Sequence, residues 1–133
     1  RFGNITFAGE GYGSAKMNRG LSNSTRGLFA GGYQPNSPYP VVSFIDYVTI
    51  ASEGNATNFG DMTSVRYNNM TTGSQTRGIL AGGQGDQPTF TREKTIDSVE
   101  YATTGTAVHF GELSVAAASG SANSDSHGGL GGF

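Results

Sequence analysis

Cysteine and tryptophan are absent from the 133-residue chain, and charged residues make up only 14% of it. Without cysteine there is no disulfide framework, no thiolate nucleophile and no cysteine-based zinc site. The eight Lys and Arg are balanced by ten Asp and Glu, which gives a nucleic-acid function little electrostatic support. No apolar run approaches the roughly 20 residues that a membrane-spanning helix needs. We therefore expect no nucleic-acid partner and no membrane insertion.

Glycine, by contrast, is abundant, with 22 residues. This is more than twice the usual share of roughly 7%, but the glycines follow no three-residue period, which excludes a collagen-like chain. The low charge also argues against a solvated, disordered chain. The sequence is therefore expected to fold, with glycine serving turns and close backbone approaches.

A repeat displaced by 51 positions organises the chain. The string Thr-Arg-Gly-apolar-apolar-Ala-Gly-Gly occupies residues 25–32 and returns at residues 76–83. The same displacement superimposes residues 59–63 on residues 110–114, both of which begin Phe-Gly. Self-similarity at a period of about 20 to 50 residues is the signature of repeat architectures, so the repeat guides the prediction of the fold.

The repeat divides the chain into two full units and two partial ones. We expect residues 1–133 to be a single portion of a larger structure. Residues 1–23 are expected to hold the end of a preceding unit and a long loop. Full units follow at 24–74 and 75–125, and residues 126–133 are expected to begin a further unit.

Each full unit has the pattern of strands and turns. Residues 27–30 and 78–81 are short apolar runs ended by a glycine pair, which favours buried inner strands. Residues 41–50 and 95–101 are rich in β-branched and aromatic residues, which is typical of longer middle strands. A last short strand is expected after the next glycine turn of each unit.

That last strand ends with a phenylalanine, Phe59 in one unit and Phe110 in the other, and we expect both to be buried at the outer edge. Four short strands at a period near 50 suit a β-propeller blade, because one twisted sheet cannot bury both faces alone and stacks on like sheets. The predicted fold is therefore all-β, a β-propeller of four-stranded blades of about 51 residues, forming part of a larger ring.

Several motifs resemble the kelch family of β-propellers. The apolar run followed by Ala-Gly-Gly, at 30–32 and again at 81–83, is similar to the double glycine of that family, and Asp61-Met62 with Arg66 resembles its segment leading to the next blade. The family's Tyr-to-Trp spacing of about six residues is not reproduced, since Tyr101 precedes Phe110 by nine. The wider repeat is similar to kelch-like repeats in structural proteins of marine bacteriophages, especially cyanophages.

This resemblance implies a non-enzymatic structural or adhesive propeller of a phage tail or virion. The implied location is the virion, on the tail or capsid surface, or the extracellular space. The implied partners are other virion proteins or a host-surface glycan or protein. A cellular kelch-type protein-interaction module and a carbohydrate-binding or enzymatic propeller are the alternatives. Association into a homo-oligomer would be one way to complete a ring.

The recurring glycine pairs could cradle a phosphate, but no Lys-Ser or Lys-Thr follows them, and recurrence in each unit favours a packing role. Arginines and aspartates also recur at single phases of the repeat, where we expect them to be buried and hydrogen-bonded within or between blades. The residues to which we assign structural roles are Gly31, Gly32, Gly82, Gly83, Arg26, Arg77, Asp46, Asp97, Phe59 and Phe110.

No catalytic, metal-binding or cofactor-binding residue is predicted. His109 and His127 lie at unrelated phases of the repeat without ligand-spaced neighbours, and no nucleophile-elbow motif is present. The variable loops at 33–40 and 84–91 are instead candidates for partner binding, because binding residues concentrate on loops held by a rigid scaffold. The loop residues selected are Tyr33, Gln34, Asn36, Tyr39, Gln84, Asp86, Gln87 and Phe90.

Overall fold

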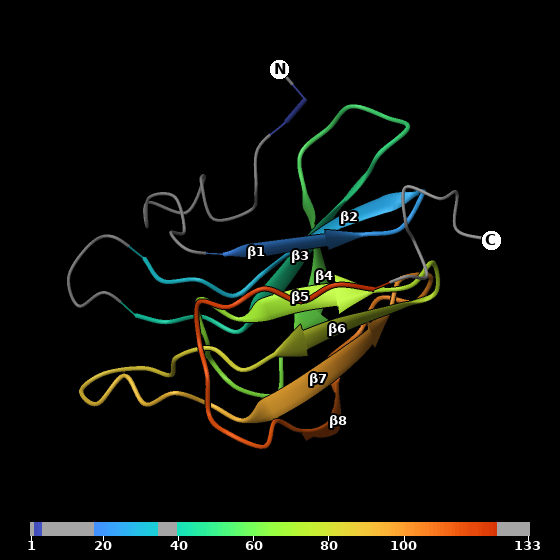
Figure 1. The fold of residues 1–133 in the computed structure, drawn as a ribbon. Helices are drawn as coiled ribbons and strands as arrows, with labels where there is room; N and C mark the ends of the chain where they lie inside the picture. Colours follow the sequence, from blue (N-terminus) through green and yellow to red (C-terminus); the bar gives the residue numbers. More distant parts are fainter. Residues whose placement is uncertain (1, 4–17, 35–39, 125–133) are drawn as a thin grey trace.

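The computed structural model describes residues 2–3, 18–34 and 40–124. Within these ranges the chain forms eight β-strands and no helix, so the all-β prediction is confirmed (Figure 1). It follows that the described part of the chain contains no helix long and apolar enough to cross a membrane.

The strands form two four-stranded antiparallel sheets, and in each sheet the strands lie in chain order. The first sheet consists of β1 (Arg19–Ser22), β2 (Arg26–Ala30), β3 (Phe44–Thr49) and β4 (Thr57–Asp61). The second sheet consists of β5 (Met70–Gly73), β6 (Arg77–Ala81), β7 (Thr95–Glu100) and β8 (Val108–Glu112).

The second sheet repeats the first, strand for strand, 51 positions later. Even the irregularities recur, because the ladder shifts register between Ile45 and Asp46 in the first sheet and between Ile96 and Asp97 in the second. The sequence repeat is therefore a repeat of one supersecondary unit.

Residues 27–30 and 78–81, which were predicted to be buried inner strands, belong to β2 and β6, and each of these lies between two other strands of its sheet. One strand precedes each of them in the sheet. The first strands, β1 and β5, were not identified because Arg-Gly-Leu-Ser and Met-Thr-Thr-Gly show no apolar alternation. These two strands lie next to each other, and the Thr71 hydroxyl donates to the Gly20 carbonyl at 2.8 Å.

The core lies between the two sheets. Its buried residues come from both units, which bury apolar surface against one another that neither sheet could bury alone. The residues are Leu28, Ala30, Ile45, Phe59 and Met62 from the first unit, and Leu80, Val99, Tyr101 and Ala107 from the second.

The glycine pairs follow directly after β2 and β6. Each pair contacts the backbone of the segment that leaves the same sheet after its last strand. Gly31 and Gly82 have φ angles of 64° and 61°, in the left-handed region that favours glycine. A Cβ at Gly31 would lie 2.2 Å from the carbonyl oxygen of Arg66, and one at Gly82 would lie 2.4 Å from that of Ala117. Both glycines are therefore required by conformation and by close backbone approach.

Candidate functional site

The two variable loops leave the sheets at the same edge of the molecule, on the left in Figure 1. In the first loop the Gln34 amide donates to the Pro40 carbonyl at 3.0 Å, which closes its base. The two loops meet where the Val41 amide donates to the Asp86 carboxylate at 3.4 Å. Of the predicted loop residues, Asn36 and Tyr39 lie outside the described residues.

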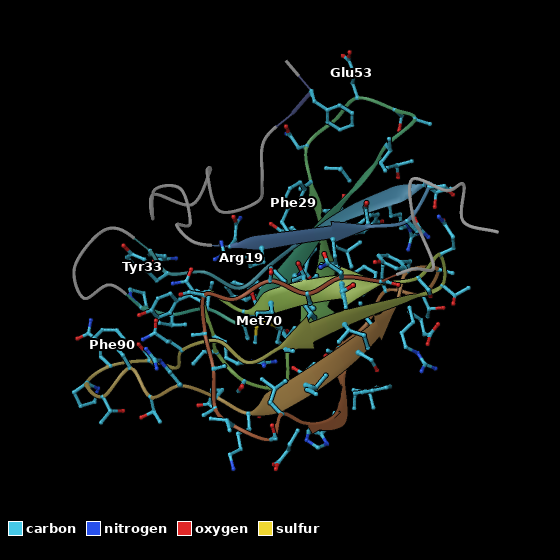
Figure 2. The ribbon with its side chains drawn as sticks, viewed as in Figure 1. Arg19, Phe29, Tyr33, Glu53, Met70 and Phe90 are labelled. Atoms are coloured by element: carbon cyan, nitrogen blue, oxygen red, sulfur yellow. The ribbon has the colours of Figure 1, made fainter. Side chains whose placement is uncertain are left out.

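Three aromatic rings join the loops into one surface, which we call the aromatic edge (Tyr33, Tyr67 and Phe90). The ring centroids of Tyr33 and Tyr67 are 5.4 Å apart with an interplanar angle of 64°, and those of Tyr67 and Phe90 are 6.3 Å apart at 89°. Both are edge-to-face contacts of the kind that aromatic pairs prefer. Figure 2 labels Tyr33 and Phe90 at this edge. Each sheet contributes one ring, and the segment between the sheets contributes the third.

Backbone hydrogen bonds hold the second loop against the segment between the sheets. Tyr67 and Gln84 exchange backbone hydrogen bonds of 3.0 and 2.9 Å, and the Gly85 amide donates to the Thr91 carbonyl at 2.9 Å. Inside this frame the Phe90 amide donates to the Asp86 carbonyl at 3.1 Å. The loop is therefore a hydrogen-bonded hairpin with a defined conformation.

Phe90 adopts an unusual backbone conformation at this edge. Its φ is 47°, in the left-handed region that a bulky residue rarely occupies, and the residue remains 39% exposed. Strained residues persist only where surrounding contacts hold them, and they cluster at functional sites. An exposed aromatic ring held in a strained conformation is a candidate binding group.

The remaining predicted loop residues differ in what they offer to a partner. Gln34 is only 7% exposed, so it serves the loop base. Asp86 and Gln87 are exposed, and the Asp86 carboxylate accepts the Gln87 amide at 2.7 Å. The Gln84 side-chain amide donates to the Phe90 carbonyl at 3.4 Å. The edge thus combines aromatic rings with amide and carboxylate groups, which suits a partner that is partly apolar and partly polar.

A buried ion pair lies at the junction between the sheets, and its arginine directly precedes Tyr67 of the aromatic edge. Arg66 and Asp97 have fully buried side chains, and Arg66 Nη2 donates to the Asp97 carboxylate. Arg66 Nη1 also donates to the carbonyls of Gly82 and Thr95, at 2.9 and 2.8 Å. Thr63 donates its amide and hydroxyl to the same carboxylate, at 3.0 and 2.7 Å. Burial lowers the pKa of Arg66, and the Asp97 charge opposes that shift.

The predicted burial of the four recurring charged residues is correct for the two aspartates and needs correction for the two arginines. Asp46 and Asp97 are buried, with exposed fractions of 2% and 0%. Arg77, in contrast, is exposed and pairs with Glu100 at 3.1 Å, while Arg26 is half-buried and donates to the Tyr101 carbonyl. The strand register excludes an arginine and aspartate pair within one sheet, because it places the two residues at positions of opposite parity, so their side chains lie on opposite faces.

Arg66 was not predicted as a structural residue. It lies in a loop between strands, and the corresponding position of the following link is Ala117, so the arginine does not recur with the repeat. The signal available in the sequence was its place in the segment resembling the kelch family's link to the next blade. Only the fold brings that loop against the carboxylate of β7.

The predicted burial of the two phenylalanines is correct for Phe59 and wrong for Phe110. Phe59 is 3% exposed and packs edge-to-face on Tyr47, with ring centroids 5.9 Å apart. The second sheet covers it, and its carbonyl accepts the Gly105 amide at 2.7 Å. Phe110 is 55% exposed, because within the described residues no further sheet lies over β8.

A cavity of about 290 Å³ opens beside the two first strands. Three segments at one phase of the repeat line it, namely residues 20–22 of β1, residues 71–73 of β5 and residues 122–124. Tyr101 also lines the cavity, and burial raises the pKa of its hydroxyl to about 12. Residues 122–124 therefore stand where the first strand of a third unit would lie.

Among the residues that the structure describes, no group of three or more His, Asp or Glu could hold a metal ion. A scan against protein-family models gave no match, and a search of curated proteins found no similar sequence.

Proposed function

We propose that this chain is a non-enzymatic binding module whose aromatic edge contacts the partner. The observation that carries this proposal is the contact of Tyr33, Tyr67 and Phe90, which unites two loops from successive sheets into one surface. Aromatic residues are enriched among the residues that dominate binding energy, and a preorganised surface loses little entropy on binding.

The proposed architecture is a portion of a β-propeller. Two observations support it, the packing of the sheets on one another and the neighbouring positions of β1 and β5. The cavity is lined by one repeat phase from three successive units, as the axial channel of a propeller would be. In such a ring the aromatic edge would recur around one rim as further loops were added.

The proposed partner is a host-surface glycan or protein, or another virion protein, and the proposed location is the virion surface or the extracellular space. The support for this location is the similarity of the repeat to kelch-like repeats of phage structural proteins. The support for the partner class is the chemistry of the edge, where the exposed ring of Phe90 lies beside amide groups and the Asp86 carboxylate.

The test measures binding of the chain to purified lipopolysaccharides and outer-membrane protein fractions from a panel of cyanobacteria. We expect binding to at least one of them, and Phe90→Ala should weaken it tenfold or more, equivalent to about 1.4 kcal/mol. Phe110→Ala removes a similarly exposed ring from β8 and serves as the matched control, with binding unchanged. A parent chain that binds none of the probes, or equal binding by the parent and Phe90→Ala, would contradict the proposal.

A further inference from the structure

Equivalent residues of the two sheets differ in burial on one face. In the first sheet Leu28, Ile45 and Phe59 point toward the second sheet and are 1%, 0% and 3% exposed. Their counterparts in the second sheet are half-buried or exposed, although the residue types are alike. These counterparts are Ile79, Ile96 and Phe110.

On the opposite face the trend reverses. Val99 and Tyr101 of the second sheet are 4% and 1% exposed, because the first sheet covers them. Their counterparts in the first unit are Val48, which is half-buried, and Ile50, which is 47% exposed. For these apolar residues burial therefore follows the presence of a neighbouring sheet, and the second sheet has one well-covered face and one open face.

Among the described residues, the open face also lacks a close backbone contact that successive units make elsewhere. A Cβ at Gly3 would lie 1.8 Å from the Gly54 carbonyl oxygen, and one at Gly60 would lie 2.1 Å from that of Gly105. The third glycine of this phase, Gly111, has no described atom within 4 Å of such a Cβ. Gly3 and Gly60 thus each lie against the glycine turn of the next unit, at Gly54 and Gly105. Gly111 occupies the same position of the repeat, so β8 could make the same contact with a further unit.

The arginines that begin β2 and β6 also differ in whether a neighbouring sheet lies against them. Arg26 lies over the Tyr47 ring, 4.7 Å from its centroid, and donates across the interface to the Tyr101 carbonyl. Arg77 lies over the Phe110 ring at 5.8 Å, and in place of such a carbonyl it has the exposed carboxylate of Glu100. Arg77 therefore holds the position from which its counterpart bridges two sheets.

We propose that the open face of the second sheet (Arg77, Ile79, Ile96, Phe110 and Gly111) binds a further four-stranded unit of the same repeat, placed next along the same polypeptide. The interface between the first and second sheets is the template for this contact. The proposal extends the propeller arrangement, and it is independent of what the aromatic edge binds.

Two observations favour the same polypeptide over a second copy of the chain. Residues 122–124 already line the cavity at the phase of a third first strand, and the Ser119 amide donates to the Asn68 carbonyl at 3.0 Å, so this segment lies beside β5 (Figure 1, red). On the first sheet, residues 2–3 already occupy the turn at Gly54, whose amide donates to the Phe2 carbonyl at 2.9 Å. A second copy docked head to tail on the open face would present its own Gly54 turn to Gly111, and that turn is already occupied by residues 2–3 of the same copy.

One position sets a requirement on the added unit. The segment between the two sheets contains Thr63 and Arg66. The corresponding positions after the second sheet are Ser114 and Ala117. An aspartate at the phase of Asp97 would therefore keep a hydroxyl partner and lose its arginine. A buried carboxylate without its cation is unfavourable, so the open face favours a unit with an uncharged residue at that phase.

The experiment inserts a second copy of residues 74–124 between Ser124 and Asp125, with Asp97→Asn in the added copy. Because the chain has no cysteine, F110C in the original unit provides a single thiol whose alkylation rate by iodoacetamide reports exposure. We expect rapid labelling in the 133-residue chain and labelling slowed by at least about tenfold in the extended chain.

V108C is the matched control on the same strand. Val108 is 66% exposed, and its counterpart Thr57 stays exposed although the second sheet is present. V108C should therefore react equally fast in both chains. Equal labelling of F110C in a folded extended chain would overturn the proposal. Protection of F110C in the 133-residue chain that grows with protein concentration, together with dimers in sedimentation, would assign the face to a second copy and would also overturn it.

A second version keeps the test decisive if the first extended chain does not fold. It retains Asp97 in the added copy and carries Ala117→Arg in the original, which restores the arginine and carboxylate pair of the existing junction. We expect this version to fold and to protect F110C in the same way. Failure of both versions to fold would count against the proposal, because the face would then not accept a unit of this repeat.

Discussion

Arg66 makes three polar contacts although its side chain is fully buried. Its guanidinium donates to two carbonyls of the second unit and to Asp97, and its side chain is not exposed to solvent. A buried charge of this kind is stable only while its partner is present, because transfer of an unpaired charge from water into the interior is costly. One residue of a loop thereby fixes how the first unit meets the second.

Arg66→Ala is expected to lower the free energy of unfolding by about 3 to 5 kcal/mol, because it leaves the Asp97 carboxylate buried without its cation. Urea denaturation would measure the change. Arg77→Ala is the matched control, since the side chains of Arg77 and Glu100 are 52% and 56% exposed and such surface pairs contribute only about 0 to 1 kcal/mol. Equal losses in the two variants would show that the buried pair does not carry the stability assigned to it.

At the scale of the strand, glycine determines how closely successive units approach. The segment Phe-Gly-Asp at the end of β4 and the segment Phe-Gly-Glu at the end of β8 are nearly identical. Their surroundings differ, because the backbone of the second unit lies against Gly60, whereas a Cβ added at Gly111 would have open space around it. The same strand ending therefore meets different steric constraints in the two sheets.

Gly60→Ala should destabilise the protein by about 1 to 3 kcal/mol, the usual cost of forcing atoms into a packed interior. The added Cβ would lie 2.1 Å from the Gly105 carbonyl oxygen, and this backbone cannot give way as a flexible side chain could. Gly111→Ala has open space at the added methyl and should change stability by less than about 0.5 kcal/mol. Thermal unfolding of both variants compares them, and a larger loss at Gly111 would contradict the assigned packing.

At the scale of the whole molecule, stability depends on the contact between the sheets, and Tyr101 belongs to the core at that contact. It is 1% exposed, and its hydroxyl has no hydrogen-bond partner among the described residues. Burial disfavours the phenolate, which raises the pKa of Tyr101 from 10.0 to about 12. Ionisation of this group is therefore coupled to the separation of the two sheets.

Stability should consequently fall at alkaline pH. The folded pKa is above the unfolded value, so the contribution of Tyr101 is fully present below pH 10.0 and is lost as the pH rises through about 12. Tyr101→Phe should remove this part of the fall, so that the stability of the parent drops relative to that of the variant as the pH rises from 10 to 12. Urea unfolding of both proteins at each pH isolates Tyr101 from other titrating groups, and parallel curves would contradict the prediction.

The sequence alone determined the period of the repeat, the all-β class and the need for glycine after β2 and β6. These features depend on local chemistry, namely which residues favour strands and which can adopt a positive φ. Strands of alternating or continuous apolar character were found in this way, whereas β1 and β5, which have neither pattern, were missed.

Burial and pairing were decided by the tertiary structure. Phe59 and Phe110 occupy one phase of the repeat, yet one is covered by the next sheet and the other is 55% exposed. Arg66, rather than a recurring arginine, reaches Asp97, and Tyr67 joins two loops into the aromatic edge from a segment that carries no binding motif. The physical reason is that a strand pattern specifies which face of a sheet is apolar, whereas exposure depends on which other sheet lies against that face.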